Sequence, residues 1–323
     1  MTLVTVIVPA FDDEAHVGAA LDSLLGQRDV DLEIVVVDDG STDGTAGAIA
    51  AAAARDPRIR AFRQEVNGGV ARARERAVAE SRGEWVWFVD SDDAWPDDAV
   101  AAMLEVGERT GADVVVAGAR FEFSSGKAGR DLPAPGIEGT EPGERALRRL
   151  LRGEITGHLW NKLFRRRVLE GIEFVPAKVQ SDLPIVAGAL AGAATVASLD
   201  RTVYTYRVRS GSVITSVARR AESLALIEGA VERAVRAHPG VAGSAEHRYF
   251  VGRYIVLSGM KDAVLGGYGP DERVVRLAVA RSRISGPVLR TFATGRDWRR
   301  LALAASARIS LPAYRRLLRV ADR

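Results

Sequence analysis

Three short apolar runs, each followed at once by polar residues, constrain the fold of this chain more than any other feature. They span residues 6–8, 34–37 and 86–89, and amphipathic helical patterns separate them. Such alternation is typical of βαβ units on a parallel sheet. We therefore predict an α/β fold in which the polar clusters meet beyond the carboxyl ends of the strands, where open α/β sheets bind their ligands.

The other elements follow from the same periodicities. The predicted strands cover residues 3–8, 33–37, 59–63, 85–89, 113–119 and 202–206, and the first predicted helices cover residues 14–27, 42–54, 69–81 and 96–109. Residues 124–143 are rich in glycine and proline, which predicts a loop between two halves of the domain. Beyond residue 216 the pattern is helical almost throughout, with breaks at residues 266–270 and 285–287.

The chain has 323 residues and no cysteine. Disulfide bonds and thiolate metal sites are therefore excluded, and a metal ion would need oxygen or imidazole ligands. The first residues predict a strand rather than an export signal, and no uncharged stretch approaches the roughly 18 residues that a membrane-spanning helix requires. These features predict a cytoplasmic protein.

Positive charge is concentrated at the carboxyl end of the chain. Residues 290–323 contain nine arginines and two aspartates, a local charge of +7, whereas the whole chain carries +3. Basic amphipathic helices over residues 297–319 would suit the inner face of an anionic cell membrane. An ordinary helical cap with its arginines in water explains the pattern equally well. A nucleic-acid-binding protein is a third class, but the aromatic residues and binding fold that it requires are missing from this sequence.

The acidic cluster Asp90-Ser91-Asp92-Asp93 follows a predicted apolar strand. Three acids so close together repel one another unless a cation neutralises them. Mg²⁺ or Mn²⁺ takes one or two protein carboxylates and completes its shell with phosphate oxygens and water. The alternative is a helix cap before Pro96, which would use Asp93 and leave the other two acids without a role.

Two further segments follow predicted strands and begin helices. Residues 38–45 place carboxylates and backbone amides where the polar edge of a nucleotide could be read, although a plain helix N-cap explains this segment better when it is taken alone. Residues 67–74 form a glycine-containing turn before a helix that carries Arg72 and Arg74. Arginine suits phosphate oxygens because its guanidinium binds them in pairs, but exposed arginines on a helix are usually only solvated.

Taken in order, these segments resemble the motifs of family 2 glycosyltransferases of the GT-A fold. The resemblance includes residues 9–11 and 159–164 and extends from residue 3 to about 215, most closely to transferases of bacterial surface polysaccharides. It implies an α/β domain with a Rossmann-like, mostly parallel central sheet flanked by helices. The implied catalytic domain covers residues 1–215, with a nucleotide-sugar-binding half at 1–120 and an acceptor half at 144–215. Residues 216–323 are then a helical, basic C-terminal extension.

The resemblance also implies roles for single residues in donor binding. Asp39 would read the nucleobase, the backbone of Pro9, Ala10 and Phe11 would line the base pocket, and Asp90 would face the ribose or the sugar. The other implied donor-binding residues are Glu14, Asn67, Arg74 and Ser91. Asp93 is left as a cap for the helix at Pro96.

Catalysis would require a metal ion and a general base. The resemblance implies that Asp92 binds Mg²⁺ or Mn²⁺ and that Asp182 takes the proton of the attacking acceptor hydroxyl, which inverts the anomeric carbon in a single displacement. Ser181 stands where the family usually has a glutamate. His158 and Trp160 lie in the segment where an acceptor should dock, although a core tryptophan and a structural histidine are the commoner readings. Lys162 is interpreted as a solvated residue on a helix face.

The implied partners are a nucleotide-sugar donor, with a UDP-sugar favoured, and a glycan or lipid-linked acceptor; a homo-oligomer is a further expectation. Two other functions stay open. A nucleotidyltransferase would need a glycine-rich phosphate loop with a lysine near the first strand, and residues 10–18 lack one. A non-catalytic nucleotide-sugar-binding protein is compatible with Ser181.

Overall fold

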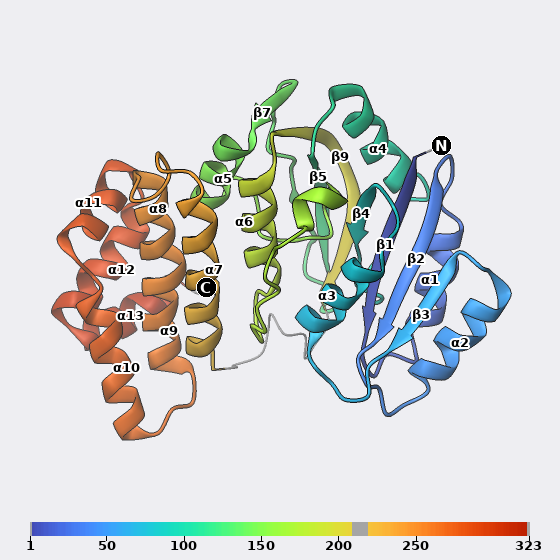
Figure 1. Ribbon diagram of the computed structural model, residues 1–323. Helices are drawn as coiled ribbons and strands as arrows, with labels where there is room; N and C mark the ends of the chain where they lie inside the picture. The colour runs from blue at the N-terminus through green and yellow to red at the C-terminus, as the bar shows by residue number, and fades with distance from the viewer. Residues whose placement is uncertain (1, 209–218, 322–323) are drawn as a thin grey trace.

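The computed structural model describes residues 2–208 and 219–321. An α/β domain built on one sheet forms one side of the molecule, and the carboxyl-terminal helices form the other (Figure 1). The predicted boundary between residues 215 and 216 lies outside the described residues.

Within residues 2–208 the strands form a nine-stranded sheet in the order β3-β2-β1-β4-β8-β5-β9-β7, with β6 paired to β5. The strands are β1 Leu3–Ala10, β2 Asp31–Asp38, β3 Ile59–Arg63, β4 Trp85–Phe88, β5 Val114–Phe123, β6 Arg130–Leu132, β7 Thr140–Pro142, β8 Lys162–Arg165 and β9 Thr195–Val208. Strands β1 to β5 and β9 run parallel, whereas β6, β7 and β8 run antiparallel to their neighbours. The predicted mostly parallel α/β sheet is confirmed.

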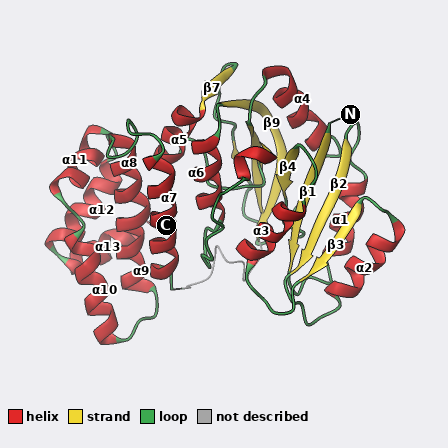
Figure 2. Cartoon of the chain, viewed as in Figure 1, coloured by secondary structure: helices red, strands yellow, loops and turns green. Residues whose placement is uncertain are grey.

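Helices cover both faces of this sheet (Figure 2). They are α1 Val17–Leu25, α2 Thr45–Arg55, α3 Val70–Glu80, α4 Ala99–Thr110, α5 Gly143–Arg152 and α6 Asp182–Gly192, with a 3-10 turn at Arg166–Leu169. Buried side chains of α1, α2 and α4 share one core layer with the sheet, and those of α3, α5 and α6 share the other. The chain therefore buries both faces of its central strands, as their continuous apolar runs require.

Helices α1, α2 and α4 each begin three residues later than predicted, at Val17, Thr45 and Ala99, and the predicted loop at 124–143 is partly strand. Helix α2 begins at Thr45 rather than at residue 42, because the Asp43 carboxylate accepts hydrogen bonds from the Thr45 amide and hydroxyl and holds the preceding residues in a turn. The predicted loop at 124–143 contains β6 and β7, which pair with β5 and β9. Strand β6 folds back on β5 as a hairpin, whereas the partner of β7 lies far along the chain, at residues 195–197, so local turn residues alone do not reveal it.

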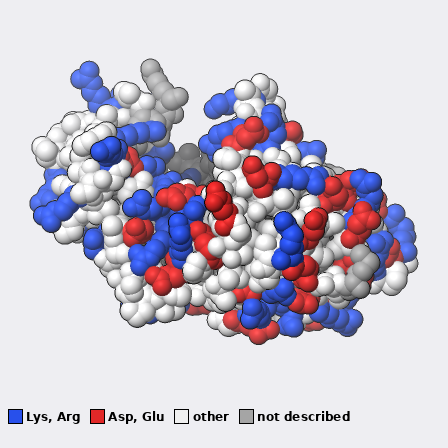
Figure 3. All heavy atoms as spheres, turned by 90° about the horizontal axis from the view of Figure 1, so that it is seen from above, with Lys and Arg blue, Asp and Glu red and all other residues white. Residues whose placement is uncertain are grey.

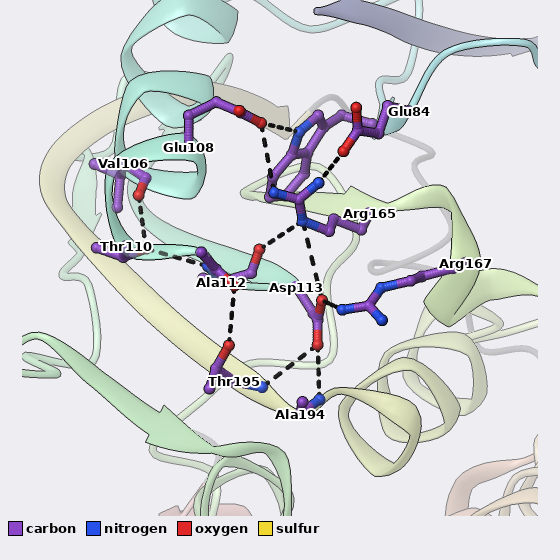
Figure 4. A network of polar contacts seen from close by, with 12 residues as sticks. Glu84, Val106, Glu108, Thr110, Ala112, Asp113, Arg165, Arg167, Ala194 and Thr195 are labelled. Carbon is purple, nitrogen blue, oxygen red and sulfur yellow. Dashed lines mark hydrogen bonds and ion pairs between the residues drawn. The ribbon is translucent and has the colours of Figure 1, made fainter.

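A polar network at the start of β5 connects this strand to β8, the 3-10 turn and β9 (Figure 4). Asp113 is buried, pairs with Arg167, and accepts a hydrogen bond from the Ala194 amide at 2.7 Å. Arg165 donates to the Ala112 carbonyl at 3.1 Å and lies over the Trp85 ring at 4.4 Å. These contacts lie at the end of the sheet away from the polar clusters, so we assign them to the stability of the fold.

The carboxyl-terminal region is helical, as predicted. It contains α7 Ala221–Arg236, α8 Ala245–Phe250, a π-helical segment Val251–Val256, α9 Leu257–Leu265, α10 Pro270–Ser282, α11 Gly286–Thr294, α12 Trp298–Ile309 and α13 Leu311–Ala321. Helix α7 packs on α6 and α8 packs on α5, which joins this region to the α/β domain. None of the helices in the described ranges combines the length and hydrophobicity needed to cross a bilayer.

Candidate functional site

Two adjoining cavities open at the carboxyl ends of β1, β2 and β4. The first has a volume of about 370 Å³ and the second about 480 Å³, and both are lined by Val70 and Asp90. The predicted residues that line the first cavity are Pro9, Ala10, Phe11, Asp39, Asn67, Asp90, Ser91 and Asp92. Those that line the second are Arg74, Asp90, His158, Trp160 and Asp182. We call them the donor cavity and the acceptor cavity, after the substrates that the sequence resemblance implies for their residues.

Asp39 holds the turn that forms one wall of the donor cavity. Its two carboxylate oxygens accept hydrogen bonds from the amides of Gly68 at 2.8 Å and Gly69 at 2.7 Å. Gly40 allows this turn to approach, because it adopts a φ of 77° and a Cβ there would lie 2.8 Å from backbone atoms of Val66 and Asn67. The sequence predicted a ligand role for Asp39 and missed this structural one.

Glu14 lines neither cavity. Its carboxylate accepts a hydrogen bond from the Gly44 amide at 2.7 Å, and its own amide donates to Asp43 at 3.1 Å. Asp12 makes a parallel contact, accepting from the Thr42 amide at 2.8 Å. These side chains connect the turn after β1 to the turn before α2. In the structure Glu14 therefore stabilises the turns next to the donor cavity and does not line it.

The acids of residues 90–93 have different surroundings. Asp90 lines both cavities, and its amide donates to the Tyr204 hydroxyl at 3.0 Å. The Ser91 hydroxyl donates to Asp13, which also lines the donor cavity and which the sequence reasoning missed. Asp92 lines the donor cavity.

The prediction that Asp93 caps a helix is wrong. Helix α4 begins at Ala99, whereas Asp93 is buried and accepts hydrogen bonds from the Tyr204 hydroxyl at 2.7 Å and the Arg207 amide at 2.8 Å. Burial, together with the neighbouring Asp90, raises the pKa of Asp93 to about 8. Asp93 therefore connects the segment of residues 90–93, which follows β4, to β9.

Arg74 connects the two cavities. Its Nη2 donates to Asp90 at 3.0 Å and its Nη1 donates to Asp182 at 2.6 Å, and only 4% of the residue is exposed. Burial alone would lower the pKa of Arg74, but the two carboxylates outweigh it and leave the pKa above its ordinary value. We call these three residues the Arg74 bridge. The sequence predicted a phosphate contact for Arg74, whereas its two terminal nitrogens bind carboxylates in the structure.

Asp182 is the first residue of α6, where the helix dipole stabilises a carboxylate. Its Oδ2 accepts a hydrogen bond from the Leu159 amide at 3.3 Å. Gln180, two residues earlier, has a φ of 57°, a left-handed conformation that a non-glycine residue rarely adopts. The left-handed residue Gln180 forms the turn before α6, and Asp182, which follows this turn, lines the acceptor cavity.

Trp160 lines the acceptor cavity as a core residue and not as an exposed platform. Trp160 is only 2% exposed, and its ring stacks on those of His158 and Tyr204 with centroids 4.6 Å and 4.9 Å away. Burial lowers the pKa of His158 to about 4, so its ring is neutral at pH 7. The two residues form part of the cavity wall.

Lys162 is not a solvated residue on a helix face. It lies in β8, is completely buried, and donates through Nζ to the His158 carbonyl at 2.6 Å and to Asn161 Oδ1 at 2.8 Å. Burial lowers its pKa to about 7, against the opposing effect of Asp182. The sequence signal for this burial is that Lys162 lies inside the mostly apolar run of residues 159–164.

Metal binding at this site would depend on the substrate. In residues 2–208 and 219–321 no group of three or more His, Asp or Glu side chains is arranged to hold an ion. The carboxylates of Asp13 and Asp92 nevertheless both line the donor cavity, which offers the oxygen ligands that Mg²⁺ and Mn²⁺ prefer. A diphosphate would have to complete the coordination shell.

The sequence model described as Glycosyl transferase family 2 matches residues 5–172. A curated relative, the succinoglycan biosynthesis protein ExoO of Rhizobium meliloti, is 30% identical over 76% of this chain and 72% of that protein. This chain belongs to glycosyl transferase family 2. Another curated relative, the putative glycosyltransferase EpsH of Bacillus subtilis, is 31% identical over 169 residues, which are 52% of this chain and about half (48%) of EpsH.

Solved structures support the fold of this family 2 chain. TarS of S. aureus, residues 1–349 in complex with UDP-GlcNAc, has a TM-score of 0.73 at 22% identity and covers 100% of this chain and 92% of that one. A mannosyltransferase of Pyrobaculum calidifontis in complex with GDP-Man and Mn²⁺ has a TM-score of 0.55 at 21% identity, over 98% and 85% of the two chains. At these identities the likeness shows the fold alone.

Proposed function

We propose that this family 2 chain is a metal-dependent, inverting glycosyltransferase that moves a sugar from a nucleoside diphosphate to a hydroxyl of a glycan or lipid-linked acceptor. The observation that carries the proposal is the Arg74 bridge. One buried guanidinium binds a carboxylate of the donor cavity, Asp90, and a carboxylate of the acceptor cavity, Asp182. A donor sugar and an acceptor hydroxyl bound in the two cavities would therefore meet beside these side chains.

The donor cavity supports binding of a nucleotide sugar. Pro9 and Ala10 provide backbone at the end of β1, and the side chain of Phe11 is partly exposed beside them, where it can cover a base. TarS with UDP-GlcNAc and the mannosyltransferase with GDP-Man share this fold. We propose a UDP-sugar as the donor.

Asp92 is the proposed metal ligand, with Asp13 beside it in the same cavity. A bound Mg²⁺ or Mn²⁺ would neutralise charge on the departing diphosphate. Asp92 would hold the ion at the cavity wall, and Ser91 fixes Asp13 through its hydroxyl. The Mn²⁺ in the mannosyltransferase complex is consistent with this choice of ion.

Asp182 is the proposed general base. Its carboxylate reaches the acceptor cavity from the start of α6, and bonds to Arg74 Nη1 and the Leu159 amide fix its orientation. In one displacement, Asp182 accepts the proton of the acceptor hydroxyl while that oxygen bonds to the anomeric carbon and the diphosphate leaves. The new glycosidic bond then has the opposite anomeric configuration.

The helical region completes the acceptor cavity. Phe250 of α8 and Tyr254 of the following π-helical segment line it together with Leu150 and Leu151 of α5. An apolar and aromatic wall of this kind suits the faces of sugar rings or the hydrocarbon part of a lipid-linked acceptor. Acceptor choice would therefore depend in part on Phe250 and Tyr254, which lie outside the matched segment 5–172.

We also propose that α12 contacts an anionic membrane. Trp298 is 64% exposed and Ile309 is 80% exposed; they lie 11 residues apart, about three helical turns, and so share one face. Arg299 and Arg308 flank that face. In Figure 3 most of the charged side chains at the helical end of the molecule, on the left, are basic, whereas the α/β end shows both signs interspersed. The pattern is that of a helix lying in a lipid interface.

Flotation with vesicles tests this contact. The wild type should float with vesicles that contain anionic phosphatidylglycerol, and a variant with Trp298→Ser and Ile309→Ser should stay with the unbound protein. Val66→Ser, which removes a 75% exposed apolar side chain from the α/β domain, is the matched control. Equal flotation of all three proteins would contradict the proposal.

Thermal stabilisation by nucleotide sugars tests the central proposal. A panel of nucleotide sugars and nucleoside diphosphates is added with and without Mn²⁺, and melting is followed. We expect one donor to raise the melting temperature in the presence of Mn²⁺ and to release its nucleotide on incubation. No stabilisation by any compound would refute the donor site. Metal-dependent stabilisation without transfer or hydrolysis would favour a non-catalytic nucleotide-sugar-binding protein.

A further inference from the structure

We propose that Lys162 is a positioning residue that acts on Asp182 through the peptide group between His158 and Leu159. The inference rests on the proposed role of Asp182 as the base. Lys162 does not line either cavity, and so it would act without touching the donor or the acceptor.

The geometry is a chain of two hydrogen bonds across one peptide group. Lys162 Nζ donates to the His158 carbonyl at 2.6 Å, and the Leu159 amide donates to Asp182 Oδ2 at 3.3 Å. The carbonyl and the amide belong to the same peptide bond, whose resonance links them electronically. A charged donor on the carbonyl polarises the amide and makes it a stronger donor, as in cooperative hydrogen-bond chains.

The surroundings of Lys162 are unusual for a structural lysine. The residue is 0% exposed, and neither of the two acceptors recorded for Nζ in the described part of the chain, the His158 carbonyl and Asn161 Oδ1, is a carboxylate. Its other acceptor, Asn161 Oδ1 at 2.8 Å, is itself held because Asn161 Nδ2 donates to the Ala117 carbonyl at 2.8 Å. An unpaired buried ammonium is costly, and an apolar side chain of similar volume would stabilise the fold more.

Lys162 changes charge near neutral pH, because burial lowers its pKa to about 7. The charged groups around this lysine and its peptide are Asp182 of α6, Arg74 of α3, Asp90 after β4 and Arg130 of β6. His158 itself is neutral in this range. As the pH rises through about 7, Lys162 loses its charge, the Leu159 amide becomes a weaker donor, and that amide holds the Asp182 carboxylate in place less firmly.

An NMR experiment reads the peptide directly and needs no activity. His158-Leu159 is the only His-Leu pair in the sequence, so protein labelled with ¹³C-carbonyl histidine and ¹⁵N-leucine gives a single HNCO signal. We expect that signal to titrate with a midpoint near pH 7 in the wild type and not in Lys162→Met. Lys178→Met, which removes an exposed lysine that lines the acceptor cavity, should titrate like the wild type. A wild-type signal that is unchanged from pH 6 to 8 would overturn the inference.

Kinetics then separate this inference from the proposed function. Lys162→Met should bind the donor normally and lose about tenfold in kcat, together with the inflection near pH 7. Lys162→Arg should recover part of kcat but not the inflection near pH 7, because its guanidinium stays charged. If Lys162→Met does not fold, Lys162→Arg replaces it in this test. A variant with the wild-type kcat and pH profile would overturn the inference. An Asp182→Asn variant as active as the wild type, with the NMR titration intact, would instead refute the assigned base.

Discussion

Replacing Arg74 with methionine removes the shared cation of the Arg74 bridge while filling most of its volume. The variant leaves Asp90 and Asp182 without their common partner. Removing one member of a buried ion pair costs about 3–5 kcal/mol. The side chains of Asp90 and Asp182 keep 31% and 18% of their surface exposed, so water solvates them in part. We therefore expect the free energy of unfolding to fall by about 3 kcal/mol, at the low end of that range.

Urea unfolding followed by tryptophan fluorescence measures this loss, because four of the five tryptophans, Trp85, Trp87, Trp95 and Trp160, lie in the α/β domain. Arg76→Met is the matched control. Arg76 lies on the same helix and pairs with Glu80 at 2.9 Å, but its side chain is 55% exposed, so its loss should cost about 0.5 kcal/mol or less. If Arg74→Met is no less stable than Arg76→Met, the bridge does not hold the two cavities together.

Three further predictions follow from single sites. Asp92→Asn should lose Mn²⁺-dependent stabilisation by nucleotide sugars and keep its melting temperature without ligand; full retention of the Mn²⁺ effect would contradict the metal assignment. The folded-state pKa of His158 is about 4, against about 6.5 in the unfolded chain, so the residue contributes stability that is complete above pH 6.5 and is lost as the pH falls toward 4. Between pH 7 and pH 5 the free energy of unfolding of His158→Phe should therefore fall by about 2 kcal/mol less than that of the wild type, as measured by urea unfolding at both pH values. An equal fall in both proteins would show that His158 titrates normally. Gly143→Ala should fold poorly, because its Cβ would lie 2.2 Å from the Ala193 carbonyl oxygen, whereas Gly47→Ala in α2 meets nothing within 4 Å and should be neutral or stabilising; similar unfolding curves for both would refute the close approach of α5 and α6.

The sequence predicted the parallel half of the sheet well. Buried strands such as β2 are continuous apolar runs that end in turn residues, so their positions can be predicted from the local sequence alone. The antiparallel strands were harder, because β8 enters between β4 and β5 from a segment about 75 residues beyond β4. Its pairing depends on tertiary contacts that no local window contains.

The candidate site was predicted in outline. Residues 9–11, Asp39 and Asp90 meet because parallel strands bring their carboxyl ends to one edge. The role of Arg74 could not be read from its neighbours, since its partner Asp182 lies 108 residues away. The burial of Lys162 was missed for a similar reason, because burial of a side chain on a short strand depends on what packs over it.

The rate of donor turnover by Asp182→Asn tests the central claim most directly. The asparagine keeps the shape of the side chain and removes its capacity to accept a proton. With the donor identified by thermal stabilisation and Mn²⁺ present, nucleotide release is measured at saturating donor and acceptor. The account predicts a fall in kcat of at least about 100-fold with donor stabilisation unchanged. A kcat within about threefold of the wild type would contradict the assignment of Asp182 as the base.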